Sequence, residues 1–185
     1  MTTVGSHAAH LERVEAPGSM LTRTAAKALA VLRVATGFVF LWAFLDKTFG
    51  FGYATPSAKA WINGGSPTKG FLSSVEAGPF QGMFHSLAGT TFANLTFMID
   101  LLAIGVAMIL GIGLRVAAIA GALMMALMWL AEWPLASGSS NPIVDYHVIY
   151  AISGVVVALT YAGYTWGLGR WWARLPLVQK NHWLI

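Results

Sequence analysis

The sequence contains no cysteine and few charged residues. Without cysteine the chain cannot form a disulfide, use a thiolate in catalysis, or hold an iron–sulfur cluster through its own side chains. Charged residues make up 10% of the 185 residues and hydrophobic residues 57%. Soluble domains carry about 25% charged residues. The composition therefore predicts a protein whose solvent is the lipid bilayer.

Four long apolar runs carry most of this hydrophobic content. They cover residues 26–45, 93–110, 116–133 and 146–168. A helix rises about 1.5 Å per residue, so each run is long enough to cross the hydrocarbon core of about 30 Å. Backbone groups inside lipid must bond to one another, so the runs must be helical. We expect an all-α integral membrane protein, with a four-helix transmembrane bundle over residues 26–170.

Basic residues are spread unevenly over the segments that flank these runs. Three lie on one side, and seven lie in the first tail and in the links on the other side: Arg13, Arg23, Lys27, Arg115, Arg170, Arg174 and Lys180. Cytoplasmic segments are enriched in Lys and Arg. We therefore expect a multi-pass protein of the plasma membrane with both termini in the cytoplasm. The net charge of +4 reflects this topology and indicates membrane lipid rather than nucleic acid as the partner.

The segments outside the runs have distinct expected roles. Residues 1–25 are mostly polar, lack a signal-peptide pattern, and are predicted to form a disordered cytoplasmic tail. Residues 171–185 are predicted to form a cytoplasmic tail at the membrane interface. The outer loop 50–91 is too long for a plain connection. Its residues 79–87 carry apolar side chains at helical spacing, which predicts a short amphipathic helix in the interface or packed back on the bundle.

Three ionisable side chains, Arg33, Asp100 and Glu132, lie inside or at the end of predicted spans. Such groups cost about 2.5–3.5 kcal/mol at the bilayer centre. Arg33 and Asp100 each lie about 10 Å from a boundary, and they could pair if the first two spans are neighbours. Arg33 could instead reach the inner boundary and serve only topology. Asp100 is too short for that and is expected to be buried with a partner. Gly37, on the Arg33 face, is expected to let a helix come close.

A polar set is expected at the outer mouth, where Asp46, Lys47, Glu132, Asp145 and His147 reach one membrane level. Asp145 directly precedes the fourth run and suits a helix N-cap. His147 begins a stripe of His and Tyr side chains at helical spacing, which could bond quinone carbonyls and relay protons. Ordinary packing with satisfied hydroxyls explains the same stripe. Asp145 and His147 are nevertheless our candidate catalytic residues.

Other cofactors find little support in the sequence. Haem ligation needs two facing histidines, and His147 is the only histidine in a run; no flavin, nucleotide or metal signature is present. Residues 63–70 are a chain of turn formers flanked by Lys59 and Lys69. Their backbone N–H groups could form a nest for a small oxyanion, although a flexible loop is the alternative. We take Lys47, Lys59 and Lys69 as candidate substrate-binding residues.

Three sequence elements are distributed over almost the whole chain after Lys27. The first reads Leu-Arg-Val-Ala-Thr-Gly from residue 32 and ends on Asp46 and Lys47. The second reads Gly-Gly-Ser-Pro-Thr-Lys-Gly over 64–70 and is followed by Gly-Pro-Phe over 78–80. The third reads Asn-Pro-Ile-Val-Asp-Tyr-His over 141–147 and is followed by Gly-Leu-Gly-Arg-Trp-Trp over 167–172 and Leu-Pro-Leu over 175–177. These segments resemble the DoxX/DoxD group of small four-helix membrane proteins. Within that group, the chain is most similar to members labelled as the large membrane-embedded subunit of thiosulfate:quinone oxidoreductase.

The resemblance implies a thiosulfate dehydrogenase (quinone)-like activity. Thiosulfate would be oxidised to tetrathionate at the outer face, electrons would pass to membrane quinone, and a smaller partner subunit would be present. On this interpretation the three candidate lysines attract the dianion, and Asp145 and His147 handle quinol protons. Arg33 and Asp100 hold the spans in register. Because the chain shows no thiol, haem pair or flavin signature, electrons must pass directly from substrate to quinone or through another chain.

Two other functions fit the sequence. The chain could be a non-catalytic membrane partner that anchors a redox or stress-response complex, which predicts a stoichiometric partner and no bound quinone. It could also be a small-solute carrier. Four helices make a thin transporter, so that function requires a homo-oligomer.

Overall fold

The computed structural model describes residues 21–136 and 141–185. Residues 1–20, most of the predicted tail over 1–25, lie outside this part. Within the described ranges all regular secondary structure is helical. The main helices are α2 (Arg23–Phe49), α5 (Thr91–Leu110), α6 (Leu114–Glu132) and α7 (Tyr146–Leu159). The prediction of an all-α fold is confirmed for the described part of the chain.

Three of these helices, α2, α5 and α6, are long and apolar enough to cross a membrane, with 27, 20 and 19 residues. They coincide with the runs predicted over 26–45, 93–110 and 116–133. Thr22 and Thr90 begin α2 and α5 by accepting hydrogen bonds from backbone N–H groups in the first turn. Gly50 and Gly111 end the same helices in the left-handed conformation that glycine adopts readily.

The fourth run differs from its prediction. A helix was expected over 146–168, but α7 has 14 residues and ends at Leu159, which corresponds to about 21 Å. Beyond it Tyr161 takes a positive φ of 52°, and a short 3-10 helix, η3 (Ala162–Tyr164), follows. Gly163 then packs directly on Gly111 at the end of α5. Residues 160–168 therefore pack against the end of α5 instead of continuing the predicted helix.

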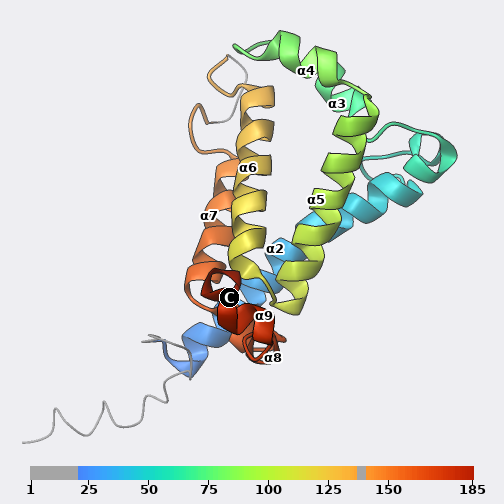
Figure 1. Cartoon of the computed structure of the whole chain (residues 1–185). Helices are drawn as coiled ribbons and strands as arrows, with labels where there is room; N and C mark the ends of the chain where they lie inside the picture. The colour runs from blue at the N-terminus through green and yellow to red at the C-terminus, as the bar shows by residue number, and fades with distance from the viewer. Residues whose placement is uncertain (1–20, 137–140) are drawn as a thin grey trace, which may run out of the picture.

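The long helices pack as two pairs joined at one end (Figure 1). Helix α7 lies along α6, and α2 crosses behind α5. Gly37 and Gly105 allow the second pairing, since a Cβ at Gly37 would lie 2.8 Å from Met108 Cβ and one at Gly105 2.7 Å from the Leu41 backbone nitrogen. The close approach expected at Gly37 is confirmed. The core between the pairs is built by Phe40, Met98, Leu101, Ile104, Met108 and Met124, among others.

Helices α5 and α6 are joined by a tight turn at Gly111–Gly113 and diverge away from it (Figure 1). Short helices bridge their far ends: α3 (Lys69–Ser73) and α4 (Gln81–Leu87). The buried Phe84 of α4 packs with Val75 and Ala131 in a small second core. Helix α4 thus lies within the predicted 79–87 helix and packs back on the end of α6.

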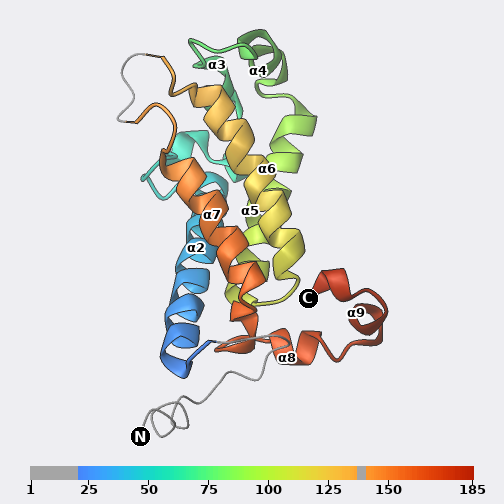
Figure 2. The same cartoon turned by 90° about the vertical axis from the view of Figure 1, so that its left-hand side faces the viewer.

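The remaining short elements lie before α3 and after η3. They are η1 (Ser57–Lys59), η2 (Trp61–Asn63), α8 (Gly169–Trp172), α9 (Pro176–Lys180) and η4 (His182–Leu184). The last three form a compact C-terminal unit beside the α5–α6 turn (Figure 2). Trp172 Nε1 donates to the Leu184 carbonyl at 2.7 Å, which closes this unit on itself. The predicted tail over 171–185 is therefore folded.

Candidate ligand-binding cavity and polar clusters

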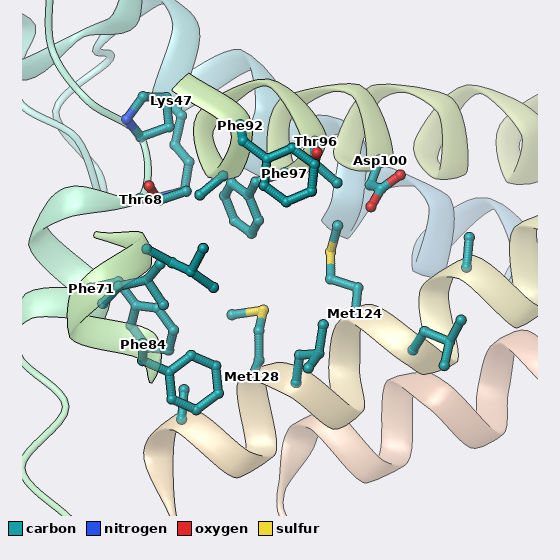
Figure 3. A pocket seen from close by; sticks show the side chains of 18 residues that line it. Lys47, Thr68, Phe71, Phe84, Phe92, Thr96, Phe97, Asp100, Met124 and Met128 are labelled. Carbon is teal, nitrogen blue, oxygen red and sulfur yellow. The ribbon is translucent and has the colours of Figure 1, made fainter. Parts of the chain in front are cut away.

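A cavity of about 570 Å³ lies between the diverging helices α5 and α6, with α3 and α4 at its end (Figure 3). Its walls are mainly aromatic, methionine and aliphatic side chains, among them Phe71, Phe84, Phe92, Phe97, Met124 and Met128. The polar side chains of the lining are few: Lys47, Thr68, Thr96 and Asp100. A cavity of this size with sparse polar groups suits a small amphiphilic molecule.

Lys47 and Asp100 lie toward opposite ends of the cavity (Figure 3). Lys47 comes from the last turn of α2, and its Nζ lies 5.7 Å from the centroid of the Phe97 ring. That distance is typical of a cation–π contact. The neighbouring Asp46 does not line the cavity. It is buried and accepts hydrogen bonds from the backbone N–H groups of Tyr53 and Ala54 at 3.4 and 2.9 Å.

Asp100 is half-buried on α5 and points toward the cavity (Figure 3). Among residues 21–136 and 141–185, no hydrogen-bond donor or cation pairs with it. The sequence predicted a buried Asp100 with a partner, and the described residues do not supply one. A carboxyl in an apolar wall is stabilised by a hydrogen-bonding partner, and a bound ligand with a donor group can supply one.

Asn94 fixes the turn that closes one side of the cavity. Its Oδ1 accepts hydrogen bonds from Ser66 Oγ at 3.0 Å, Thr68 Oγ1 at 2.7 Å and the Thr68 backbone nitrogen at 3.1 Å. Thr68 is itself part of the lining. Asn94 was not among the residues predicted from the sequence, where its signal is an amide side chain at the start of an otherwise apolar span.

The structure separates the three candidate lysines. Lys47 lines the cavity, whereas Lys59 and Lys69 do not and are exposed on η1 and α3. The expected anion nest over 63–70 lacks most of its donors, because these backbone N–H groups bond to acceptors within the chain. They belong to Asn63, Gly64, Gly65, Thr68 and Lys69.

Arg33 is fully buried and bonds to backbone carbonyls. Its Nη1 donates to the carbonyls of Met108 and Ile109, the latter at 2.6 Å. Its Nη2 donates to Trp166 at 2.9 Å and Thr165 at 3.4 Å. The carbonyl end of a helix carries partial negative charge, so a guanidinium is stabilised there. Arg33 thus holds α2 to the end of α5 and to residues 165–166, and its partners do not include Asp100.

A second polar cluster joins the end of α6 to the start of α7. Asp145 caps α7, since its Oδ1 accepts hydrogen bonds from the backbone nitrogens of His147 and Val148 at 3.0 and 3.2 Å. Its Oδ2 lies 2.7 Å from His147 Nδ1, and His147 is fully buried. Glu132 accepts a hydrogen bond of 2.7 Å from the Tyr146 hydroxyl. The predicted cap at Asp145 is confirmed.

The electrostatics of Asp145 follow from these contacts. Burial raises the pKa of its carboxyl, but the hydrogen bonds from His147 and Val148 outweigh burial and hold the pKa below its ordinary value. Asp145 is therefore a carboxylate at neutral pH. Neither Asp145 nor His147 is part of the cavity lining, so the two candidate catalytic residues and the cavity are separate features.

Comparison of the chain with models of protein families, with curated proteins and with solved structures gave no significant match. The resemblance to the DoxX/DoxD group stays a prediction from the three sequence segments.

Proposed function

We propose that this chain is a membrane protein that binds a lipid-soluble quinone in the cavity between α5 and α6, as the membrane subunit of a quinone-linked oxidoreductase. The cavity is the observation that carries the proposal. Its volume of about 570 Å³ falls within the range of small-molecule sites, about 300–1,000 Å³. A planar quinone ring with an isoprenoid tail matches aromatic and methionine walls that carry few polar groups.

Side chains of the cavity lining can contact the quinone ring and both of its oxygen atoms. The Phe92 and Phe97 rings offer faces and edges to the quinone ring, and the Lys47 ammonium donates a hydrogen bond to one carbonyl oxygen. At the other end the quinol hydroxyl donates to the Asp100 carboxyl, which has no partner among the described residues. Lys47 and Asp100 thereby distinguish the quinone from a plain hydrocarbon chain.

The electron donor in this proposal is thiosulfate, as the family resemblance implies. Two thiosulfate ions form one S–S bond and give tetrathionate and two electrons, and these electrons with two protons reduce the quinone to quinol. Lys59 and Lys69 are exposed on the segment before α5 and favour the approach of an anion. The electrons pass from thiosulfate to the quinone either directly or through the smaller partner subunit that the family resemblance implies.

We also propose four membrane crossings with cytoplasmic termini. Helix α7 lies along α6, and the Leu168 backbone nitrogen donates to the Leu110 carbonyl at 2.7 Å, so residues 160–168 extend α7 to the end of α5 (Figure 2). Non-helical backbone is tolerated at membrane depth where it is buried in protein. The buried Arg33 satisfies part of this backbone by donating hydrogen bonds to the carbonyls of Thr165 and Trp166.

The topology is tested by labelling, because the chain has no cysteine of its own. Ser57→Cys and Gln179→Cys place single thiols at exposed positions on the two sides of the proposed bundle. A membrane-impermeant maleimide added to intact cells should label the first variant and reach the second only after lysis. Equal labelling of both variants in intact cells would contradict the topology.

The function is tested by thiosulfate-dependent quinone reduction in native membranes, with the gene deleted and then restored. Activity should disappear on deletion and return with the wild-type gene. Lys47→Ala should raise the quinone concentration needed for half-maximal rate, while Lys59→Ala should leave it unchanged. Activity that survives deletion removes thiosulfate as the donor, and equal effects of the two lysine variants remove Lys47 from the quinone site.

A further inference from the structure

We propose that Glu132, Asp145 and His147 form a binding site for a divalent transition-metal ion of the zinc class. This proposal does not depend on the quinone site, since none of the three residues lines the cavity. The three side chains come from the end of α6 and the start of α7. They converge so that one potential ligand atom from each lies within 4.8 Å of the other two.

The spacing fits an ion after a small adjustment. Zinc bonds of about 2.0–2.2 Å place the donor atoms of a tetrahedral site about 3.5 Å apart. The pair formed by Asp145 Oδ2 and His147 Nδ1 is already closer, at 2.7 Å, and must open slightly. Glu132 is exposed, so a small rotation of its side chain can supply the remaining movement.

The donor set has the chemistry of a zinc-type site. One imidazole with two carboxylates favours zinc over magnesium or calcium, which prefer oxygen donors alone. Three protein ligands leave a fourth position for water or substrate, as in catalytic rather than structural zinc sites. Two carboxylates beside one imidazole also repel each other, and a divalent cation neutralises both.

The pairing of Asp145 with His147 explains only part of the cluster. His147 is fully buried, and among residues 21–136 and 141–185 the partner of its Nδ1 is Asp145, itself a candidate metal ligand. The pairing gives no reason for Glu132 to approach the same point. Ligation by an ion accounts for this approach and holds the ring by a direct bond.

The surroundings hold these ligands in place before any ion arrives. Tyr146 donates to Glu132 at 2.7 Å and orients its carboxylate. Trp129 Nε1 donates to the Ile143 carbonyl at 3.1 Å, which ties the segment before α7 to α6. Asp145 is fixed by its capping bonds to the backbone of α7. Such outer contacts are typical of metal sites and raise their affinity.

The test is a zinc titration of the full-length, metal-free protein in detergent, by calorimetry or by competition with a chromophoric chelator. We expect one zinc ion per chain from this site. Glu132→Gln removes a charged ligand from an exposed position, so it should fold normally and bind zinc at least about tenfold more weakly, since even outer-shell changes cost about 10–100-fold. Glu76→Gln, at another exposed glutamate, is the matched control and should bind as the wild type does.

A second readout identifies the donors. X-ray absorption of the zinc-loaded wild type should show one imidazole nitrogen and otherwise oxygen ligands. A wild-type protein that binds no zinc overturns the proposal. So does binding that Glu132→Gln leaves unchanged, which would place the ion elsewhere, for instance on His7 and His10 near the N-terminus.

Discussion

Replacing Arg33 should loosen the end of the bundle where the helix pairs meet. The guanidinium makes four hydrogen bonds to backbone carbonyls, two on α5 and two on residues 165–166. Interhelical hydrogen bonds in membrane proteins contribute about 0.6 kcal/mol on average and at most about 1.7 kcal/mol. Arg33→Met removes all four and leaves the carbonyls buried, so we expect a loss of about 2–4 kcal/mol in the free energy of unfolding.

Two comparison variants sharpen this prediction. Arg33→Lys keeps the positive charge but cannot reach both pairs of carbonyls with one ammonium group. Its free energy of unfolding should therefore lie between those of Arg33→Met and the wild type. Lys27→Met removes an exposed charge from the same helix and should have little effect. The assay is steric trapping or denaturant unfolding in detergent, with amide hydrogen exchange at residues 161–168 as the local readout. An Arg33→Met protein as stable as the Lys27→Met protein would refute the reasoning.

Three further predictions follow from packing and capping. Gly163→Ala should prevent normal packing and lower the stability, because its Cβ would overlap the Gly111 carbonyl. The control is Gly82→Ala in α4, whose Cβ meets no atom within 4 Å, so it should leave the stability unchanged or raise it. Thermal unfolding compares the two variants. Asn94→Ala should speed hydrogen exchange at residues 66–69, with unchanged exchange as the contrary result. Asp145→Ala should cost about 1 kcal/mol of stability at pH 7. Because its folded-state pKa is lowered, this contribution exists above the unfolded pKa and vanishes as the pH falls through the folded one, which stability curves against pH will show.

The long helices could be predicted from the sequence because their signal is local. Apolar runs of about twenty residues need no tertiary information, and Thr22, Thr90 and Asp145 mark helix starts through contacts within three residues. The end of α7 could not be predicted in this way. It depends on Gly163 meeting Gly111, about fifty residues earlier in the chain, and on the positive φ of Tyr161.

In the candidate site, too, the sequence predicts individual residues but not their tertiary contacts. The sequence singles out Arg33 as a buried charge that needs a partner, but its partners are backbone carbonyls as many as 133 residues away. Every residue has a backbone carbonyl, so the sequence does not indicate which carbonyls will bind Arg33. The cavity likewise arises from the divergence of α5 and α6 and from a turn held by Asn94. Lys47 and Asp100 could be named as unusual residues, but their shared cavity could not.

The central claim is that the α5–α6 cavity is the quinone site, and filling it is the most direct test. Ala120 lines the cavity, whereas Ala126 is exposed on the same helix and does not. Binding of a short-chain ubiquinone analogue to the purified protein should weaken at least about tenfold in Ala120→Phe, because the added ring occupies the space of the ligand ring. It should stay at the wild-type level in Ala126→Phe. Wild-type affinity in Ala120→Phe, or an equal loss in both variants, would contradict the account.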